Sequence, residues 1–437
     1  MKRVLVITYY WPPSGGAGVQ RWLKFTKYLP EFGWQPVIYT PENPEAPVDD
    51  PSLKGDIHPE TEVIKRPIWE PYNFYKRFIG KNRGDRINAG FLSEHEKSKK
   101  KEGISVWIRG NFFIPDARRF WIKPSIRFLH KYLLENPVDA IISTGPPHSM
   151  HLIALGLKHR LDLTWIADFR DPWTEIDFYN QLRLTRRSDR KHKIQESSVL
   201  NGADKVVVIG KTMAERFSIA QKITPVVIPN GYDEADFTKK TEDSGKEFSI
   251  VHIGAMNRDR NHPAFWEAIS ELIKEQPELT SDLMIILVGK LDVSVLRIIS
   301  QHDLQDRVKI EAYLPHDQIS PLLQSASALY LPINNTPNAK MIQTGKLFEY
   351  LAAGRPILGM GPDDGVAAHI IEECQAGEMI GFTDKVKLKT ILKDWAELNQ
   401  KGELFIEPSG IEKYSRKNLT VKLVELLDQL KHAEKRY

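Results

Sequence analysis

The stretch QTGKLFEYLAAGRPIL, residues 343–358, carries the strongest structural signal in the chain. It reads as a loop, a helix with Lys346 and Glu349 on one face, a glycine stop and a strand, because positions three apart lie about one turn apart. Thr344, Gly345 and Lys346 at the start of this helix suit a diphosphate, and a carboxylate one turn later suits the paired hydroxyls of a ribose. A surface ion pair between Lys346 and Glu349 is the simpler alternative.

Short apolar runs rich in β-branched residues alternate with longer helical stretches along the whole chain. One series of runs lies at 4–8, 37–40, 140–143, 165–167 and 206–209, and a second lies at 248–254, 283–288, 308–311, 328–331 and 356–359. Alternating strands and helices predict parallel βαβ units in a doubly wound sheet. We therefore expect an α/β protein with two Rossmann-like domains that face a central cleft.

The polar stretch 239–246 separates the two series and lacks hydrophobic periodicity, which is typical of a linker. It divides the chain into an N-terminal domain at 1–240 and a C-terminal domain at 247–410, followed by a last helical stretch at 411–437. A chain of 437 residues is too long for one ordinary core, and 41% hydrophobic with 27% charged residues is a globular composition.

Composition also bears on localisation and partners. No run of about twenty apolar residues is present, and the first apolar run reads as a strand rather than a signal peptide, so we expect a cytoplasmic protein. Cys374 is the only cysteine, which excludes an intramolecular disulfide and a cysteine-rich metal site. A net charge of +4 is too small to indicate nucleic-acid binding.

Residues 61–134 depart from this pattern as an insertion in the first domain. They are rich in tryptophan, phenylalanine, tyrosine, lysine and arginine, as at 68–78, 97–101 and 118–123. Basic residues mixed with aromatic ones can seat a protein on an anionic membrane surface, which would place it peripherally on the inner face. An irregular insertion with a solvated basic face explains the composition equally well.

A glycine-rich turn follows the first predicted strand. Gly15 and Gly16 stand where a ligand can approach the backbone and where the next helix offers unpaired N–H groups to a phosphate or a sugar hydroxyl. A dinucleotide fingerprint fits poorly, because Arg21 stands where a third glycine belongs and the second strand ends at 38–40 without an acidic residue. A purely structural tight turn is the other interpretation.

Polar side chains follow two later strands of the first domain. His148 follows one strand in a Gly-Pro-Pro turn, and Asp168, Arg170 and Asp171 end the next. Ligands of open α/β sheets bind at such strand ends. A guanidinium recognises phosphate or carboxylate, and carboxylates hold sugar hydroxyls or accept a proton, so these four residues are the catalytic candidates. The alternatives are a structural histidine and a buried Asp–Arg pair that braces the loop.

With these motifs the sequence resembles the GT-B glycosyltransferases, and specifically family 4, often labelled glycosyltransferase group 1. The resemblance runs essentially from end to end. Gly254 and Arg258, in the turn after the first strand of the second domain, add a flexible turn and a cation. The resemblance rests on the glycine loop at 15–16, the segments 144–148 and 168–173, the hinge-like segment 228–233 and the helix and strand start at 346–356.

This resemblance implies a retaining transfer without metal, with the nucleotide sugar held by the C-terminal domain and the acceptor largely by the N-terminal one. Glu349 would bind the ribose, Lys346 and Arg258 the diphosphate, and Gly16 the phosphate or sugar from across the cleft. Three consecutive residues would edge the base: Tyr313, Leu314 and Pro315.

Two features depart from the family pattern. Arg170 and Asp171 stand where the family usually has a strand-end histidine, so the polar contact there is altered. Met341 occupies the first position of the usual Glu-x7-Glu pattern that ends at Glu349, so the usual contact with the donor sugar is missing and the donor stays open. The stretch 414–430 has helical periodicity, and in this fold such a helix crosses back to the N-terminal domain.

The sequence thus predicts transfer of a hexose-type sugar from a nucleotide diphosphate sugar to a glycan or lipid-linked acceptor in cell-surface polysaccharide biosynthesis, without a metal or other cofactor. Lys346 and Arg258 would stabilise the leaving diphosphate. One alternative is a nucleotide-sugar epimerase on the same fold. The other is a non-catalytic GT-B subunit that binds nucleotide or a partner enzyme, favoured by Met341 and the altered strand end.

Overall fold

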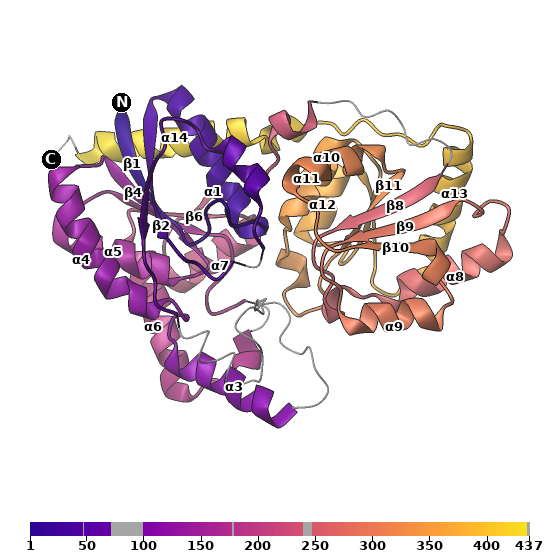
Figure 1. Cartoon of the computed structure of the whole chain (residues 1–437), viewed down its shortest axis with the longest axis horizontal. Helices are drawn as coiled ribbons and strands as arrows, with labels where there is room; N and C mark the ends of the chain where they lie inside the picture. Colours follow the sequence, from indigo (N-terminus) through magenta and orange to yellow (C-terminus); the bar gives the residue numbers. More distant parts are fainter. Residues whose placement is uncertain (47, 71–98, 177–178, 239–246, 435–437) are drawn as a thin grey trace. The chain divides into compact units, whose positions relative to one another are not determined.

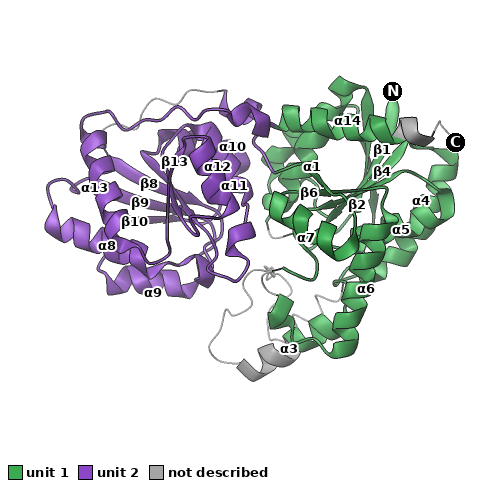
Figure 2. Cartoon of the chain, turned by 180° about the vertical axis from the view of Figure 1, so that it is seen from behind, with its two compact units in different colours: residues 1–89, 95–229, 416–437 green, residues 90–94, 230–415 purple. Residues whose placement is uncertain are grey.

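The computed structural model describes residues 1–46, 48–70, 99–176, 179–238 and 247–434. The chain divides into two compact units, coloured separately in Figure 2. Among the described residues, unit 1 comprises 1–229 and 416–434, and unit 2 comprises 230–415. The predicted linker at 239–246 and residues 71–98 of the aromatic and basic insertion lie outside the described residues.

Unit 1 is built on a seven-stranded parallel sheet in the order β3-β2-β1-β4-β5-β6-β7. Its strands are β1 (Lys2–Ile7), β2 (Trp34–Pro41), β3 (Glu62–Arg66), β4 (Ala140–Gly145), β5 (Trp165–Phe169), β6 (Lys205–Val208) and β7 (Val226–Val227). Its helices, labelled in Figure 1, are α1 (Ala17–Tyr28), α3 (Lys99–Phe112), α4 (Arg119–Glu135), α5 (Ser149–Leu161), α6 (Arg186–Gly202), α7 (Lys211–Gln221) and α14 (Arg416–Glu434).

Alternate residues of the central strands feed two separate cores. Leu5 and Ile7 join one core with α4 and α5, whereas Val4 and Val6 join the other with α1 and α14. This division follows from the period of two along a strand, which sends neighbouring side chains to opposite faces. The sheet is therefore covered by helices on both sides, as its continuous apolar strands predict.

The last helix completes the core of unit 1. Leu419, Leu423 and Leu427 of α14 are buried in the same core as Trp22 and Phe25 of α1. The Lys2 ammonium lies 2.5 Å from Asp428 and so ties the first strand to the same helix. The first and last segments of the chain thus belong to one hydrophobic core.

Unit 2 contains a six-stranded parallel sheet in the order β10-β9-β8-β11-β12-β13. Its strands are β8 (Phe248–Ile253), β9 (Leu283–Val288), β10 (Val308–Glu311), β11 (Ala328–Pro332), β12 (Ile357–Met360) and β13 (Gly377–Ile380). Helices α8 (Pro263–Glu275), α9 (Val293–Gln301) and α13 (Lys385–Gln400) share one core, and α10 (His316–Ser325), α11 (Gly345–Ala353) and α12 (Val366–Glu373) share the other.

The structure confirms the predicted α/β class and the two parallel sheets. Strands β3, β7 and β13 are additional to the predicted ones. β3 and β13 are short, only partly buried and lack a continuous apolar run, and β7 has only two residues. Unit 1 ends at Pro229 rather than at the predicted residue 240, because Tyr232 is buried in the core of unit 2, where its N–H donates to the Tyr414 carbonyl at 3.2 Å. No helix in the described part of the chain combines the length and apolar character that crossing a bilayer requires.

Candidate functional site

Each sheet has one point where the order of its strands reverses along the chain. This point lies between β1 and β4 in unit 1 and between β8 and β11 in unit 2. Ligands of open parallel sheets bind beyond the carboxyl ends of the strands at such a switch point, where the following loops diverge. The loops concerned are 8–16 and 146–148 in unit 1, and 254–262 and 333–344 in unit 2. They contain six of the fifteen predicted site residues, namely Gly15, Gly16, His148, Gly254, Arg258 and Thr344.

Lys346 occupies the first turn of α11 and approaches the end of β8. Its Nζ lies 3.5 Å from Nε2 of His252, whose Nδ1 lies 3.0 Å from the Tyr330 carbonyl oxygen. A carbonyl only accepts hydrogen bonds, so the proton of the neutral ring belongs on Nδ1 and Nε2 presents a lone pair to the ammonium. Burial and the charge of Lys346 both lower the pKa of His252, which keeps the ring neutral.

The electrostatics of Lys346 favour an anionic ligand. Burial lowers the pKa of its ammonium well below the usual value, and the charge of Arg260 lowers it further, while Glu349 opposes them. A partly buried cation that carries such a penalty is stabilised by any anion placed beside it. The first N–H groups of α11 add to this preference, because they have no acceptor within the helix.

Gly254 is the residue that leaves room for this ammonium. It follows β8 with φ at +94°, a conformation that residues with a side chain rarely adopt. A Cβ built there would lie 3.0 Å from Nζ of Lys346. Gly289 packs just as closely behind it, since its own Cβ would lie 2.9 Å from the Gly254 carbonyl carbon. At the predicted flexible turn, the backbone of Gly254 therefore lies close to the ammonium of Lys346.

The second cation at this position is Arg260, not the predicted Arg258. Both lie in one short helical turn, in which Arg258 is exposed. The Arg260 guanidinium donates to the Ala255 carbonyl at 2.9 Å and to Oδ1 of Asn334 at 2.6 Å, and its charge lowers the pKa of Lys346. The turn, capped by Asn257 through the Arg260 N–H at 3.1 Å, decides which arginine points inward.

The two loops at the switch point of unit 2 are tied together. The Asn335 N–H donates to the Asp259 carbonyl at 2.8 Å, and Nε2 of His262 lies 2.9 Å from the Ile333 carbonyl. Together with the Arg260–Asn334 contact, these bonds hold the β8 loop against the β11 loop. The cations are thus placed by a braced framework, which limits the reorganisation needed when a ligand binds.

The other predicted donor residues surround the start of α11 or lie at the same edge of the sheet. Glu349 is half-buried one turn beyond Gly345, and Oγ1 of Thr344 is buried without a hydrogen-bond partner among the described residues. Beyond β10, Tyr313 is 40% exposed and Leu314 and Pro315 are partly buried. Because all strands are parallel, their following loops share one edge.

In unit 1, only one glycine of the predicted pair stands at the helix start. Gly16 caps α1 with φ at +90° and ψ at 174° and is half-buried. Gly15 is buried, and its N–H donates to the Val48 carbonyl at 2.9 Å. The geometry therefore gives Gly16 the position from which a ligand is reached, and Gly15 the role of fixing the loop.

Asp168 is engaged in a buried ion pair. Arg21 reaches its carboxylate at 2.8 Å, and both Trp22 Nε1 and Thr144 Oγ1 donate to it at 2.8 Å. Burial acts to raise the pKa of Asp168, but the charge of Arg21 and these hydrogen bonds outweigh it and lower the pKa. Arg21 also donates to the carbonyls of Ile228 and Pro229, so the pair braces the end of unit 1 and positions the loops rather than meeting a substrate.

Arg170 and Asp171 lie immediately beyond β5. The Arg170 guanidinium donates to the carbonyls of Gly18 at 3.0 Å and Pro146 and so joins the N-terminal turn of α1 to the loop after β4. Burial lowers the pKa of Arg170 and the charge of Asp171 raises it, so the carboxylate favours the charged guanidinium. Asp168 is only 1% exposed, whereas Asp171 is half-buried. Asp171 is therefore the carboxylate of this segment that lies nearer the surface.

His148 lies at the start of α5 in an aromatic environment. Its ring stacks on Trp173 at 4.6 Å with an interplanar angle of 2°, and the side chain is 7% exposed. Burial holds the pKa of His148 well below its ordinary value, so the imidazole is neutral. Its Nδ1 is buried without a hydrogen-bond partner among the described residues. Stacking thus fixes the ring, and a neutral imidazole is suited to a hydrogen bond rather than to charge stabilisation.

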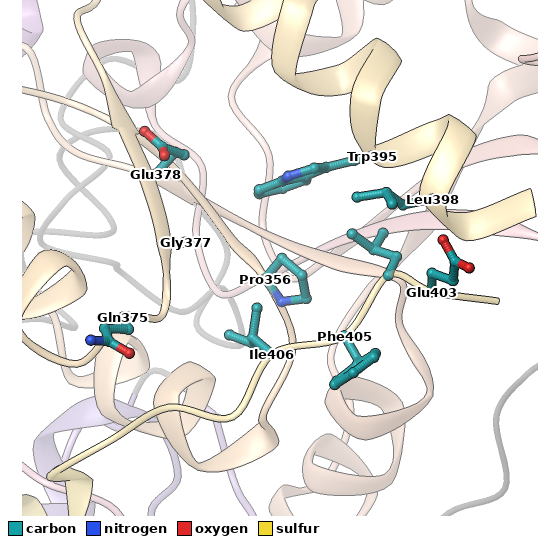
Figure 3. Close-up of a pocket in the computed structure, with 10 residues that line it drawn as sticks. Pro356, Gln375, Gly377, Glu378, Trp395, Leu398, Glu403, Phe405 and Ile406 are labelled. Carbon is teal, nitrogen blue, oxygen red and sulfur yellow. The ribbon is translucent and has the colours of Figure 1, made fainter. Parts of the chain in front are cut away.

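A shallow cavity of about 300 Å³ in unit 2 lies away from this site (Figure 3). Pro356, which precedes β12, and Gly377, which begins β13, line it together with Trp395, Phe405 and Ile406. These strand positions are amino ends, the opposite edge of the sheet from Gly254. The cavity is therefore separate from the candidate donor site.

Solved structures with the same fold cover almost the whole chain. Sucrose-phosphate synthase from Thermosynechococcus elongatus is 13% identical with a TM-score of 0.61, and covers 99% of this chain and 100% of its own. WaaG, a glycosyltransferase involved in lipopolysaccharide biosynthesis, is 14% identical with a TM-score of 0.59, over 97% and 99%. HepE of Anabaena in complex with UDP is 12% identical with a TM-score of 0.57, over 98% and 100%.

The same fold also occurs in a Listeria monocytogenes protein described as a UDP-N-acetylglucosamine 2-epimerase, at 12% identity and a TM-score of 0.54 over 100% and 98% of the two chains. No family model and no curated protein matches the sequence. At these identities the likeness establishes the fold alone. The chain therefore has the GT-B fold, the two-sheet architecture that glycosyltransferases acting on nucleotide sugars share.

Proposed function

We propose that the chain is a glycosyltransferase whose unit 2 holds a nucleotide-diphosphate sugar. The observation that carries this proposal is the partly buried ammonium of Lys346 at the N-terminus of α11, 3.5 Å from a neutral His252 and next to the charge of Arg260. Two cations and a helix N-terminus at a switch point match a diphosphate, and Glu349 one turn later matches the ribose hydroxyls.

In this proposal the chemistry depends on the leaving group. The bond between the anomeric carbon and the donor's diphosphate oxygen breaks, and negative charge gathers on that oxygen. Lys346 and Arg260 stabilise this charge from fixed positions, so reorganisation costs little. The acceptor hydroxyl forms the new bond to the anomeric carbon with retention and without a metal, and its proton passes to the departing diphosphate oxygen. No protein side chain attacks the sugar.

Unit 1 supplies the acceptor side in the same proposal. Gly16, His148 and Asp171 are the residues that meet the sugar or the acceptor, while Asp168 and Arg170 hold their loops in place. The acceptor is a glycan or a lipid-linked sugar in cell-surface polysaccharide assembly at the cytoplasmic side of a membrane. WaaG, a protein of the same fold involved in lipopolysaccharide biosynthesis, supports this acceptor, and the complex of HepE with UDP-glucose supports a nucleotide-sugar donor.

A thermal-shift panel of nucleotide diphosphates and their sugars tests the donor site, because a ligand that binds only the folded state raises apparent stability. We expect a shift with one base, lost in Glu349→Ala and kept in Glu372→Ala, an exposed control on α12. Product analysis with that donor then separates transfer from epimerisation. Binding without turnover with any acceptor would instead favour a non-catalytic subunit, and no shift with any nucleotide would remove the proposal.

A further inference from the structure

Unit 1 displays a cluster of aromatic side chains on its surface. Trp69, Phe112, Phe120 and Trp107 are 64%, 57%, 44% and 39% exposed. Trp69 contacts Phe120 with ring centroids 4.9 Å apart, Phe120 contacts Phe113 at 6.2 Å, and Trp107 contacts Phe112 at 5.7 Å. We call these five residues the aromatic patch. Exposed apolar clusters of this kind mark interaction sites, since a folded monomer gains nothing from leaving them in water.

Arginines border the aromatic patch. The Arg119 guanidinium lies 5.5 Å from the Phe120 ring and donates to the Phe112 carbonyl, which ties the two halves of the patch together. At the end of α3, Asn111 donates to the Arg183 carbonyl at 3.3 Å and accepts from the Thr185 N–H at 2.7 Å. The segment that leads into α6 therefore lies against the patch, and Figures 1 and 2 both show α3 beside the start of α6.

This leading segment and the first turns of α6 together expose four arginines, Arg183, Arg186, Arg187 and Arg190, which we call the arginine cluster. Arg186 and Arg187 stand in the first turn of α6, where the helix dipole disfavours cations and favours anions. The acidic residue there, Asp189, is paired with Lys193 at 2.9 Å and accepts from Tyr179 at 3.0 Å. The arrangement therefore costs the free protein stability and suits an incoming anion.

A cavity of about 340 Å³ opens within the arginine cluster. Arg183, Arg186, Tyr179 and Asn180 line it together with Leu184 and Asp189. Guanidinium groups bind phosphate with two parallel hydrogen bonds, and the first N–H groups of α6 provide further donors. The cavity is thus large enough and polar enough to receive a phosphate group.

We propose that the aromatic patch and the arginine cluster dock unit 1 on an anionic lipid bilayer. The aromatic rings enter the headgroup region, where amphipathic aromatic side chains are favoured, and the arginines bind lipid phosphates. Lipid fits better than single-stranded nucleic acid, because the ring pairs meet at 68° to 79°, edge to face, and so offer no stack of parallel faces to bases. The proposal goes beyond the donor site and does not depend on it.

Co-sedimentation of the full chain with vesicles tests this docking. We expect binding to vesicles of phosphatidylglycerol and phosphatidylcholine, none to phosphatidylcholine alone, and a decline as salt rises through the physiological range. Arg183→Glu/Arg186→Glu/Arg187→Glu should weaken binding at least tenfold, since a single cation near such a surface contributes about fivefold. Trp69→Ser/Phe112→Ser/Phe120→Ser should abolish the part of binding that resists salt.

Matched controls keep the test specific. Ile219→Ser/Phe405→Ser removes two residues that are 83% and 69% exposed elsewhere, and Lys222→Glu/Lys401→Glu reverses two exposed cations. Both controls should bind vesicles as the wild type does, and all variants should keep their melting temperature and their nucleotide response. Absence of wild-type binding to anionic vesicles, equal binding to neutral ones, or equal losses in the controls would overturn the proposal. Binding to a single-stranded oligonucleotide in place of vesicles would overturn it as well.

Discussion

Nζ of Lys346 lies 3.5 Å from Nε2 of His252, a neutral ring held by the Tyr330 carbonyl, so a partly buried cation faces a lone pair. A lone pair compensates a buried charge only partly. The ligand-free protein therefore holds its positive charge at a cost in folding stability, and that cost is what an anionic ligand relieves.

Lys346→Met should stabilise the ligand-free protein. The unfolded chain keeps this proton up to the ordinary lysine pKa of 10.5, whereas the folded protein releases it at lower pH, so stability rises with pH between the two pKa values. At neutral pH we expect a gain of about 0.5–2 kcal/mol, measured by urea unfolding, with loss of the nucleotide response. Lys340→Met, an exposed control whose lysine is paired with Asp364, should gain no folding stability. Destabilisation by Lys346→Met would contradict the prediction, since it would show that the charge of the ammonium is compensated in the folded protein.

Where the pH lies above the lowered pKa of Lys346, nucleotide binding should take up a proton. Burial and Arg260 lower the pKa of Lys346 in the free protein, and a bound diphosphate raises it again. Affinity should consequently fall as pH rises through the lowered pKa. Calorimetry in buffers of different ionisation enthalpy measures the uptake, which should vanish in Lys346→Met. Proton release on binding would contradict the assignment.

Gly254→Ala should impair both folding and binding. The backbone at φ +94° disfavours a side chain by about 1 kcal/mol or more, and the added Cβ forces Lys346 to move. We expect a loss of about 1–2 kcal/mol in unfolding free energy and at least tenfold weaker nucleotide binding by calorimetry. Gly381→Ala, where a Cβ meets nothing within 4 Å, is the matched control; an equal effect there would refute the close approach.

Arg260 and Arg258 form a natural pair of variants. Arg260→Gln should weaken binding of the nucleotide diphosphate about tenfold or more, the usual effect of losing one charge-assisted contact. Arg258→Gln should change it less than about twofold, because that side chain is exposed. Titration calorimetry of the two variants decides between them, and the reverse order would restore the sequence-based assignment.

Asp168→Asn should lower stability strongly, because it leaves the Arg21 guanidinium buried without its counter-charge. Breaking one partner of a buried pair costs about 3–5 kcal/mol, whereas removing both in Arg21→Met/Asp168→Leu should recover part of the loss. Urea unfolding measures both. The exposed control Asp162→Asn should lie within about 0.5 kcal/mol of the wild type. Unchanged stability with abolished activity would return Asp168 to the catalytic residues.

Local spacing is what the sequence predicts well. The apolar runs predict the fold class, and the spacing of Lys346 and Glu349 predicts their place one turn apart on α11. The edge strands β3 and β13 could not, since half-buried strands do not need an apolar run.

Contacts between residues that are far apart in the sequence could not be predicted from it. Arg21 and Asp168 are 147 positions apart, and nothing in the sequence links them, although a buried pair was one interpretation of Asp168. Likewise, the sequence does not distinguish Arg258 from Arg260 as the second cation. The geometry of the short helical turn after Asn257 makes the distinction. His252 belongs to no sequence motif. Its role depends on a hydrogen bond to the Tyr330 carbonyl of a neighbouring strand, which the sequence does not reveal.

The position of α14 also sets an order of events during synthesis. Trp22 and Phe25 share their core with Leu419 and Leu423, which leave the ribosome after the whole of unit 2. Residues 230–415 are contiguous, so unit 2 has its complete sequence while unit 1 still lacks a helix. We expect a chain stalled just after residue 415, with a tether long enough to clear the exit tunnel, to protect unit 2 from protease but not unit 1. Unit 1, most of which is made before unit 2, would then become stable after it.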